Sequence, residues 1–445
     1  MKSEKSFKKF IFLWITQSIS EIGSAVTLFS LIIWLTQTFN DPSEKQELAF
    51  SLAATSISFS LAYILIQPYT GVLVDRFNRR HIMLISNYLS GILTFILVFL
   101  LVFDYMNVPL LVLYNACLAI CRAFHMASFS SSFIIIVPEN HLSRANAMTQ
   151  ASFNSAEVLG PVLASFLIAT PSLFGHGHSA IYSPFMEGIP FAIGIDAITF
   201  LVGAFALHFL RFPSFNKREE NAGFLNSFRE GIKFINKPLY WLLAIIALSN
   251  LFIPTMITLQ PLLVKYHLSD IWTKGGISYD SALATLNSVN ALGGIMGGVI
   301  LAFWGGIKSK KVYGIIIPMI IIGILQIFYG ISNLFYLTVT IGFFIFFLTT
   351  FMSTHSHTIW QSVTPVHLQG RVFAVRRMLA QITWPLSGIL AGWIGGAFNV
   401  AHGIIGIGII CTILSILFLF NSSFLSVDNA IINDEAVNKD YDRTI

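Results

Sequence analysis

The stretch Gly71-Val-Leu-Val-Asp-Arg-Phe-Asn-Arg-Arg80 lies between two long apolar segments, residues 49–74 and 81–103. It begins with a glycine, carries an Asp-Arg pair in its centre and ends with two arginines. Charged side chains are costly to place in hydrocarbon, so this pattern predicts a short turn in water between two membrane helices. We expect Asp75 to reach a neighbouring helix end, and the arginines to pair with it or with lipid phosphate. The stretch therefore predicts a chain that crosses a membrane more than once.

The composition indicates a membrane protein along the whole chain. Of the 445 residues, 55% are hydrophobic and 11% are charged, whereas soluble chains carry about 25% charged residues. The formal charge of +5 comes from bases that are scattered over short loops, so we expect no nucleic-acid partner. The three cysteines all lie in apolar runs and predict packing rather than a disulfide framework or a metal site.

The apolar runs have the length that a bilayer-spanning helix needs, and they predict an all-α polytopic fold with twelve membrane-spanning helices. The predicted spans are 10–36, 49–74, 81–103, 109–137, 145–170, 189–211, 239–264, 280–306, 312–332, 333–357, 372–396 and 402–425.

The basic residues predict the orientation of these helices. Of the 26 Lys and Arg residues, all but four lie in segments on the same side as the N-terminus. The exceptions are Lys45, Lys265 and Lys274 in the opposite loops, and Arg122 within a span. Basic residues gather on the cytoplasmic side of membrane proteins, so both termini are predicted to be cytoplasmic.

An internal repeat predicts two halves. Residues 138–144, after the fourth span, are similar to residues 365–371, after the tenth, and the basic loop 308–311 repeats the position of Arg79-Arg80. Both pairs are separated by nearly the same length of chain, which predicts two pseudo-symmetric six-helix bundles. The predicted domains are an N-terminal bundle at 1–211, a cytoplasmic linker with an amphipathic helix at 212–238, a C-terminal bundle at 239–425 and a cytoplasmic tail at 426–445.

Four ionisable residues, Glu21, Arg122, Glu157 and Asp196, are predicted to lie deep within the spans of the first half. A charge at the bilayer centre costs about 2.5 kcal/mol or more to insert, so four of them predict a shared polar site that faces a water-filled cavity. In one interpretation Glu21 and Glu157 couple transport to protons, Arg122 is their counter-ion and Asp196 is a third candidate. The alternative is a static salt-bridge network that fixes helix packing.

Amide and aromatic side chains recur within the spans of both halves. They suit hydrogen bonding and stacking on an uncharged or amphipathic compound, although packing between membrane helices uses the same residue types. The candidate substrate-cavity residues are Gln17, Asn154, Asn250, Asn287, Asn290, Trp360, Gln361 and Gln381.

Several motifs resemble those of the major facilitator superfamily. The turn fills every fixed position of its G-x-x-x-D-R-x-x-R-R gating motif, with Gly71, Asp75, Arg76, Arg79 and Arg80. Gly160-Pro161 is similar to the start of the G-P-x-x-G motif in the fifth helix of its drug exporters, with Ala164 in place of the last glycine. Arg122 is similar to the fourth-helix arginine of those exporters, but His125 and Met126 replace the Gln-Gly pair that follows there.

Over most of its length the chain resembles the drug:proton antiporter branch that contains macrolide and siderophore exporters. This resemblance implies alternating access in the cell (inner) membrane and export of an amphipathic organic compound in exchange for protons, by a monomer without cofactor or metal. The alternatives are a proton-coupled uptake symporter for a nutrient and a non-transporting membrane receptor or scaffold. The sequence contains no nucleotide-binding glycine loop and no nucleophile–base motif, so we expect neither ATP use nor enzymatic activity.

Overall fold

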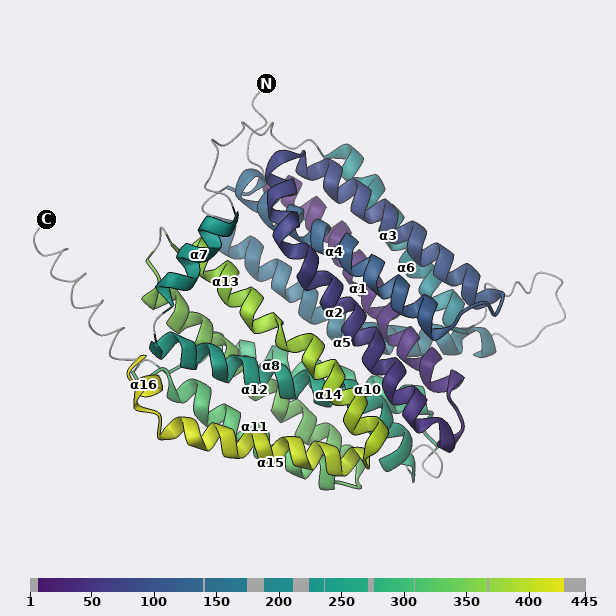
Figure 1. Ribbon diagram of the computed structural model, residues 1–445. Helices are drawn as coiled ribbons and strands as arrows, with labels where there is room; N and C mark the ends of the chain where they lie inside the picture. Colours follow the sequence, from purple (N-terminus) through teal and green to yellow (C-terminus); the bar gives the residue numbers. More distant parts are fainter. Residues whose placement is uncertain are drawn as a thin grey trace, which may run out of the picture. The chain divides into compact units, whose positions relative to one another are not determined.

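The computed structural model describes residues 7–138, 141–173, 188–210, 224–235, 237–270, 276–307, 309–365 and 368–427. Within these ranges the chain is helical and contains no strand (Figure 1). It divides into two compact units, Met1–Glu219 with Gly275–Ser288, and Glu220–Lys274 with Val289–Ile445. The predicted all-α fold is confirmed.

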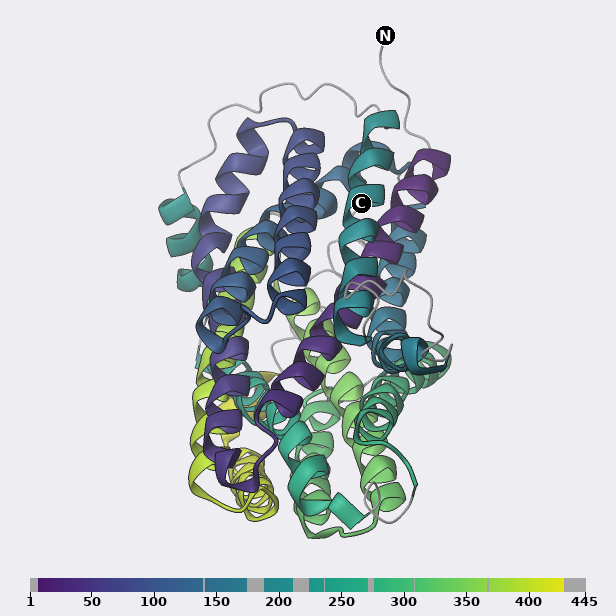
Figure 2. The same ribbon diagram turned by 90° about the vertical axis from the view of Figure 1, so that its right-hand side faces the viewer.

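In its described residues the first unit contains six long helices and a short 3-10 turn. Helix α1 packs against α5 and α6, α2 packs against α4, and α3 packs against α4 and α6. Figure 2 shows α1, in purple, as one continuous helix. The elements are α1 (Phe7–Thr38), η1 (Pro42–Glu44), α2 (Lys45–Arg76), α3 (Arg79–Val102), α4 (Val108–Ile136), α5 (Leu142–Leu173) and α6 (Gly188–Phe209).

An apolar core closes the end of this unit at which α1 begins. It joins the first turns of α1, α3 and α5 to the last turns of α4 and α6, and burial of these side chains holds the helix ends together. Its buried members are Phe10, Leu13, Met83, Leu84, Phe129, Ile136, Val137, Ala145, Ala204, Leu207 and Leu210.

The charged stretch quoted first forms a tight turn between α2 and α3. The backbone N–H of Phe77 donates to the Leu73 carbonyl at 2.9 Å and closes α2. Asn78 begins α3, because its side-chain oxygen accepts from the backbone N–H of Arg80 at 3.0 Å and satisfies a donor that would otherwise be free at the helix start.

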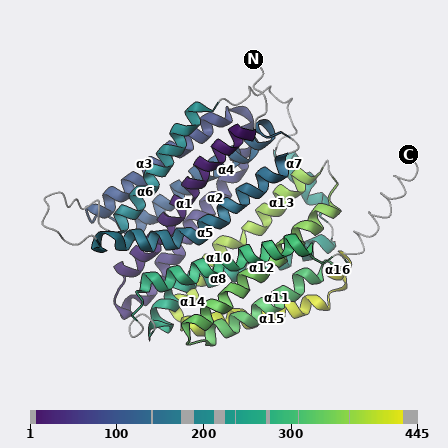
Figure 3. The same cartoon turned by 180° about the vertical axis from the view of Figure 1, so that it is seen from behind.

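The part of the second unit that the structure describes contains eight further helices and the greater part of α10. Helix α11 packs against α12 and α15, and α8 packs against α14. Figures 1 and 3 both show α11 and α15 side by side. The elements are α7 (Phe224–Phe234), α8 (Lys237–Leu262), the π-helical turn η4 (Leu263–His267), α10 (Tyr279–Trp304), α11 (Tyr313–Ile331), α12 (Phe335–Val363), α13 (Gln369–Gln381), α14 (Thr383–Ala397), α15 (Val400–Leu419) and α16 (Ser422–Leu425).

Eleven helices of the described residues are long and apolar enough to cross a membrane. The predicted span 372–396 is divided between α13 and α14, which meet at Ile382. Pro385 explains the break, because it has no N–H to donate to the Gln381 carbonyl. Side chains satisfy the neighbouring carbonyl, since the Ala380 oxygen accepts from Asn250 Nδ2 at 3.1 Å and from Thr383 Oγ1 at 2.8 Å.

Candidate functional site

Glu21 and Arg122 form an ion pair between α1 and α4. Arg122 Nη2 donates to Glu21 Oε2 at 2.7 Å, and the side chains are 16% exposed for Glu21 and 33% for Arg122. A charge that leaves water needs a partner of opposite sign, and a hydrogen-bonded carboxylate–guanidinium pair provides one. Two of the four charges that the sequence placed within the spans are therefore in direct contact.

Asp196 of α6 lies close to this ion pair, and its carboxylate has its own hydrogen-bond donors. Its side chain is fully buried, and it accepts from Thr27 Oγ1 at 2.7 Å and from Thr199 Oγ1 at 3.1 Å. The charges of Glu21 and Arg122 both act on it. Two threonine donors therefore hold a carboxylate that has no direct contact with the guanidinium.

Gly23 of α1 makes room for Asp196. A Cβ atom at this position would lie 2.5 Å from Asp196 Oδ1 and 2.5 Å from Thr199 Oγ1, closer than non-bonded atoms approach. A glycine therefore lets α6 bring its carboxylate against α1. Sequence reasoning missed Gly23, Thr27 and Thr199, because nothing in a single chain shows which residues of α1 face α6.

Glu157 lies apart from the other three charges. Its side chain is exposed on α5, and the described residues place no hydrogen bond or ion pair on its carboxylate. One turn further along α5, a Cβ on Gly160 would overlap the Cβ and backbone of Ala25 in α1. The carbonyl of Val158 accepts from Ser288 Oγ at 2.8 Å. The Gly160-Pro161 segment is thus a site of close helix packing in the first unit.

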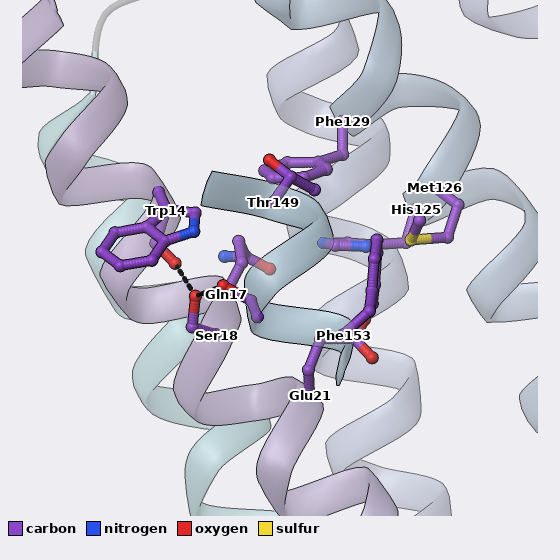
Figure 4. Close-up of a pocket in the computed structure, with 10 residues that line it drawn as sticks. Trp14, Gln17, Ser18, Glu21, His125, Met126, Phe129, Thr149 and Phe153 are labelled. Atoms are coloured by element: carbon purple, nitrogen blue, oxygen red, sulfur yellow. Dashed lines mark hydrogen bonds between the residues drawn. The ribbon is translucent and has the colours of Figure 1, made fainter. Parts of the chain in front are cut away.

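A small pocket adjoins Glu21 and is shown in Figure 4. It has room for about one water molecule. Ser18 and Ser152 hydroxyls are 2.7 Å apart, and Trp14 Nε1 donates to the Met148 carbonyl at 3.0 Å. The lining residues come from α1, α4 and α5: Trp14, Gln17, Ser18, Glu21, His125, Met126, Phe129, Thr149, Ser152 and Phe153.

Two polar atoms of this pocket have no hydrogen-bond partner among the described residues. They are Gln17 Nε2 and His125 Nε2, and both are buried. Figure 4 shows the His125 ring extending from α4 toward the side of the pocket on which Gln17 lies. Gln17 was a predicted cavity residue, whereas His125 was noted in the sequence only as a departure from a family motif.

The turn between α2 and α3 is tied to neighbouring helix ends by its arginines. Arg79 Nη1 donates to the Ser131 carbonyl of α4 at 2.8 Å. Arg80 donates from Nε to the Leu207 carbonyl and from Nη2 to the His208 carbonyl of α6, each at 2.8 Å. The backbones of Gly71, Asp75 and Arg76 belong to the end of α2, and the side chains of Asp75 and Arg76 lie outside the described part of the structure.

The predicted substrate-cavity amides differ in their hydrogen-bond partners and exposure within their own units. Asn154 accepts from Gln150 Nε2 at 3.0 Å on an exposed face, and Asn287 Nδ2 donates to the Leu283 carbonyl at 3.0 Å. Gln361 is exposed. Asn250 binds the carbonyl at the break between α13 and α14, and Gln381 is the last residue of α13.

Trp360 is fully buried, and the Arg376 guanidinium lies 5.5 Å from its ring centroid. This distance is within the range of a cation–π interaction. Trp360 Nε1 has no hydrogen-bond partner among the described residues. The residue therefore contributes to the interior of the second unit rather than to an open surface.

Asn290 belongs to a buried polar cluster that the sequence did not reveal as a group. Its amide nitrogen and oxygen and the Gln326 Oε1 atom have no partner within the described ranges. The Tyr329 hydroxyl lies beside the Gln260 amide, and the Tyr329 ring and Asn290 Oδ1 both lie next to Gly342 of α12. All four polar side chains are at most 1% exposed.

No group of three or more His, Cys, Asp or Glu residues that could hold a metal ion occurs among the described residues. Cys117, Cys121 and Cys411 are free thiols. The chemistry of the site is therefore that of an ion pair, hydroxyl and amide groups and a histidine.

Long apolar helices in two units, with paired charges inside one of them, define a polytopic membrane transporter. The Major Facilitator Superfamily model matches residues 13–387, and the chain belongs to this family. Its substrate is a small molecule, its surroundings are membrane lipid, and its location is the cell membrane.

Relatives and solved structures agree with this assignment. Macrolide efflux protein A of Streptococcus pyogenes is 23% identical over 92% of this chain and 96% of its own. The protein of that name from Enterococcus faecalis is 22% identical over 76% of this chain and 98% of its own.

The structural neighbours show the fold. A bacterial homolog of the human lysosomal transporter Spinster, in an inward-facing and unoccupied conformation, matches with a TM-score of 0.68 at 14% identity, over 96% of this chain and 98% of its own. A D-xylose-proton symporter matches with a TM-score of 0.64 at 14% identity, over 94% of this chain and 98% of its own.

Proposed function

We propose that this protein is a proton-coupled exporter of amphipathic organic compounds that works by alternating access. The observation that carries the proposal is the 2.7 Å ion pair between Glu21 and Arg122, inside helices long enough to span a bilayer. Ionisable groups at such positions are costly, and in transporters they mark ion and proton pathways.

The pair provides a physical means of coupling. A proton and the Arg122 guanidinium compete for the same carboxylate, because a protonated Glu21 no longer carries the charge that attracts arginine. The pair joins α1 to α4. Protonation of Glu21 therefore raises the free energy of the conformation in which α1 and α4 are paired, relative to a conformation in which they are not. A proton gradient can then shift the population of conformations, as alternating access requires.

The proposed direction and substrate class come from the relatives. Two proteins called macrolide efflux protein A align with most of this chain, and macrolides are large amphipathic compounds. Export by a proton gradient also agrees with the absence of a nucleotide-binding glycine loop in the sequence. We therefore assign the energy source to protons rather than to ATP.

We further propose that the turn between α2 and α3 is a cytoplasmic gating element and that both termini are cytoplasmic. The proposed orientation rests on the distribution of Lys and Arg. Arg79 and Arg80 donate to backbone carbonyls of α4 and α6. These bonds hold the ends of three helices together, and their release would let that end of the unit open.

Inside-out membrane vesicles test the proposal directly. An imposed proton gradient, acid inside, is expected to drive accumulation of a radiolabelled macrolide by the wild-type protein, and an uncoupler is expected to abolish it. Glu21→Gln is expected to remove this accumulation. Glu157→Gln is the matched control, because it makes the same change at a carboxylate outside the ion pair, and it is expected to retain transport.

The outcomes separate the alternatives. Wild-type accumulation by Glu21→Gln would overturn the assignment of the coupling acid. Equal loss in both variants would place coupling on both carboxylates. Gradient-driven uptake in right-side-out vesicles, with none in inside-out vesicles, would favour a symporter, and transport of no compound in either direction would favour a receptor or scaffold.

A further inference from the structure

We infer that the pocket between α1, α4 and α5 is a binding site for one water molecule, through which His125 exchanges protons with Glu21. This inference rests on the proposed proton coupling at Glu21 and adds the route by which protons reach it.

The pocket extends from the ion pair toward the end of the unit that carries the α4–α5 connection. On α4, which runs toward that end, His125 follows Arg122 by about one turn. On α1, which runs away from it, Gln17 precedes Glu21 by about one turn. Both residues thus lie on the same side of the pair, between Glu21 and the apolar core at the end of the unit.

The unpartnered polar atoms that line the pocket can be satisfied by a bound water molecule. Gln17 Nε2 and His125 Nε2 are buried, without a partner among the described residues, and Gln17 is 5% exposed. An unsatisfied buried polar atom costs about 1–3 kcal/mol. A buried water normally makes two to four hydrogen bonds. The pocket has room for about one water, which could accept from Gln17 and also bond His125 and Glu21.

Among the residues that line the pocket, His125 is the group that can accept a proton from Glu21. Glu21 from α1 and Arg122 from α4 are the charged groups that act on it, and the α5 residues of the lining, Thr149, Ser152 and Phe153, carry no charge. Ser18 and Ser152 already bond each other. Trp14, Met126, Phe129 and Phe153 supply apolar walls.

The transfer needs no group beyond these. The protonated Glu21 carboxyl gives its proton to the water, and the water gives one of its own protons to His125 Nε2. The carboxylate is then free to pair with Arg122, and the imidazolium carries the proton. The reverse sequence loads Glu21. Histidine suits this role because an imidazole nitrogen can both accept and release a proton.

The vesicle assay also tests the inference, with His125→Gln and the matched control His141→Gln. His141 lies outside the pocket and stacks on Phe7 with ring centroids 4.7 Å apart. His125→Gln is expected to slow proton-driven accumulation about a hundredfold, the lower end of general acid–base effects. It should keep gradient-free exchange of labelled for unlabelled macrolide, which needs no net proton movement. His141→Gln is expected to retain both activities.

Chemical rescue distinguishes proton transfer from a structural role. His125→Ala leaves a space in which added imidazole can replace the missing ring, and added imidazole is expected to restore proton-driven accumulation. If His125→Ala does not fold, the accumulation measured for His125→Gln tests the inference instead. Wild-type accumulation by His125→Gln, while Glu21→Gln is uncoupled, would overturn the inference and leave the proposed function standing. Retained coupling in Glu21→Gln would overturn the proposed function itself.

Discussion

The two units stabilise polar groups in their interiors in different ways. In the first unit, Glu21 pairs with Arg122 at 2.7 Å, and Asp196 accepts from two threonines. In the second unit, the buried polar cluster consists of neutral amides and a phenol, and amide atoms of Asn290, Gln326 and Gln260 have no partner among the described residues.

This difference follows from the cost of burial. An isolated charge in a low-dielectric interior is so costly that it must be paired, which fixes one geometry. A neutral amide costs less to leave open and can bond a ligand or a water when one arrives. The first unit is therefore suited to binding and release of a proton, and the second unit to reversible hydrogen bonding of an uncharged group.

The largest effect on stability is expected when one partner of the Glu21–Arg122 ion pair is removed. Arg122→Gln leaves the Glu21 carboxylate without its cation and is expected to destabilise the protein by about 3–5 kcal/mol. The double variant Glu21→Gln/Arg122→Gln removes both charges and is expected to recover most of this stability without recovering transport. Thermal unfolding in detergent, together with the vesicle assay, measures both effects.

A substitution in the second unit provides the comparison. Gln326→Leu removes a buried neutral amide whose Oε1 has no partner within the described ranges, so its effect on the free energy of unfolding is expected to stay within about 1 kcal/mol. If Gln326→Leu destabilised the protein as much as Arg122→Gln, the distinction between a paired charge and an open neutral amide would be wrong.

The sequence was sufficient for the features that depend on local pattern. Apolar run length predicted the helical membrane fold, and the spacing of Gly71 to Arg80 identified both the turn and the family. The sequence also identified Glu21 and Arg122 as charged residues within the predicted membrane spans. Which carboxylate meets Arg122 depends on how helices rotate against one another, and this information is not local.

The lack of information on helix rotation also explains the other differences between the sequence prediction and the structure. Gly23 has no pattern that marks it as the neighbour of Asp196, and Glu157 was grouped with the other charges on depth alone. The division of the predicted span 372–396 at Ile382 lies close to Pro385. Prolines are common in membrane helices, so a proline inside an apolar run does not by itself predict a break.

Two glycines allow a second comparison of the units. A Cβ on Gly23 would meet Asp196 Oδ1, and a Cβ on Gly342 would meet Asn290 Oδ1. Asp196 is held by two hydrogen bonds, whereas the Asn290 amide has no partner in the described ranges and can turn away. Gly23→Ala is therefore expected to lower stability by about 2–3 kcal/mol, and Gly342→Ala by about 1 kcal/mol.

Each of these variants has a control in its own unit. A Cβ on Gly194 of α6 or on Gly406 of α15 would have no neighbour within 4 Å. Alanine at such helical positions is expected to stabilise by up to about 1 kcal/mol. Thermal unfolding of the four variants ranks the effects, and a larger loss for Gly342→Ala than for Gly23→Ala would show that the Asn290 amide is held as firmly as the Asp196 carboxylate.

The smallest effect is expected at the turns, where the two units again differ. In the first unit Arg80 donates to the Leu207 and His208 carbonyls, and an arginine stays protonated at all relevant pH values. In the second unit His355 Nδ1 lies 2.8 Å from the Phe351 carbonyl, and its Nε2 lies 3.0 Å from the Ile307 backbone nitrogen. This arrangement fits a neutral imidazole, because Nε2 must accept.

Removing the imidazole should therefore loosen one turn and not the other. His355→Phe takes away the Nε2 atom that accepts from the Ile307 N–H, and the loss of one hydrogen bond corresponds to about 1 kcal/mol. Native-state hydrogen exchange is expected to show less protection of Ile307 in His355→Phe than in the wild-type protein, and unchanged protection around Arg80. Wild-type protection of Ile307 in this variant would show that the contact with His355 does not stabilise the turn.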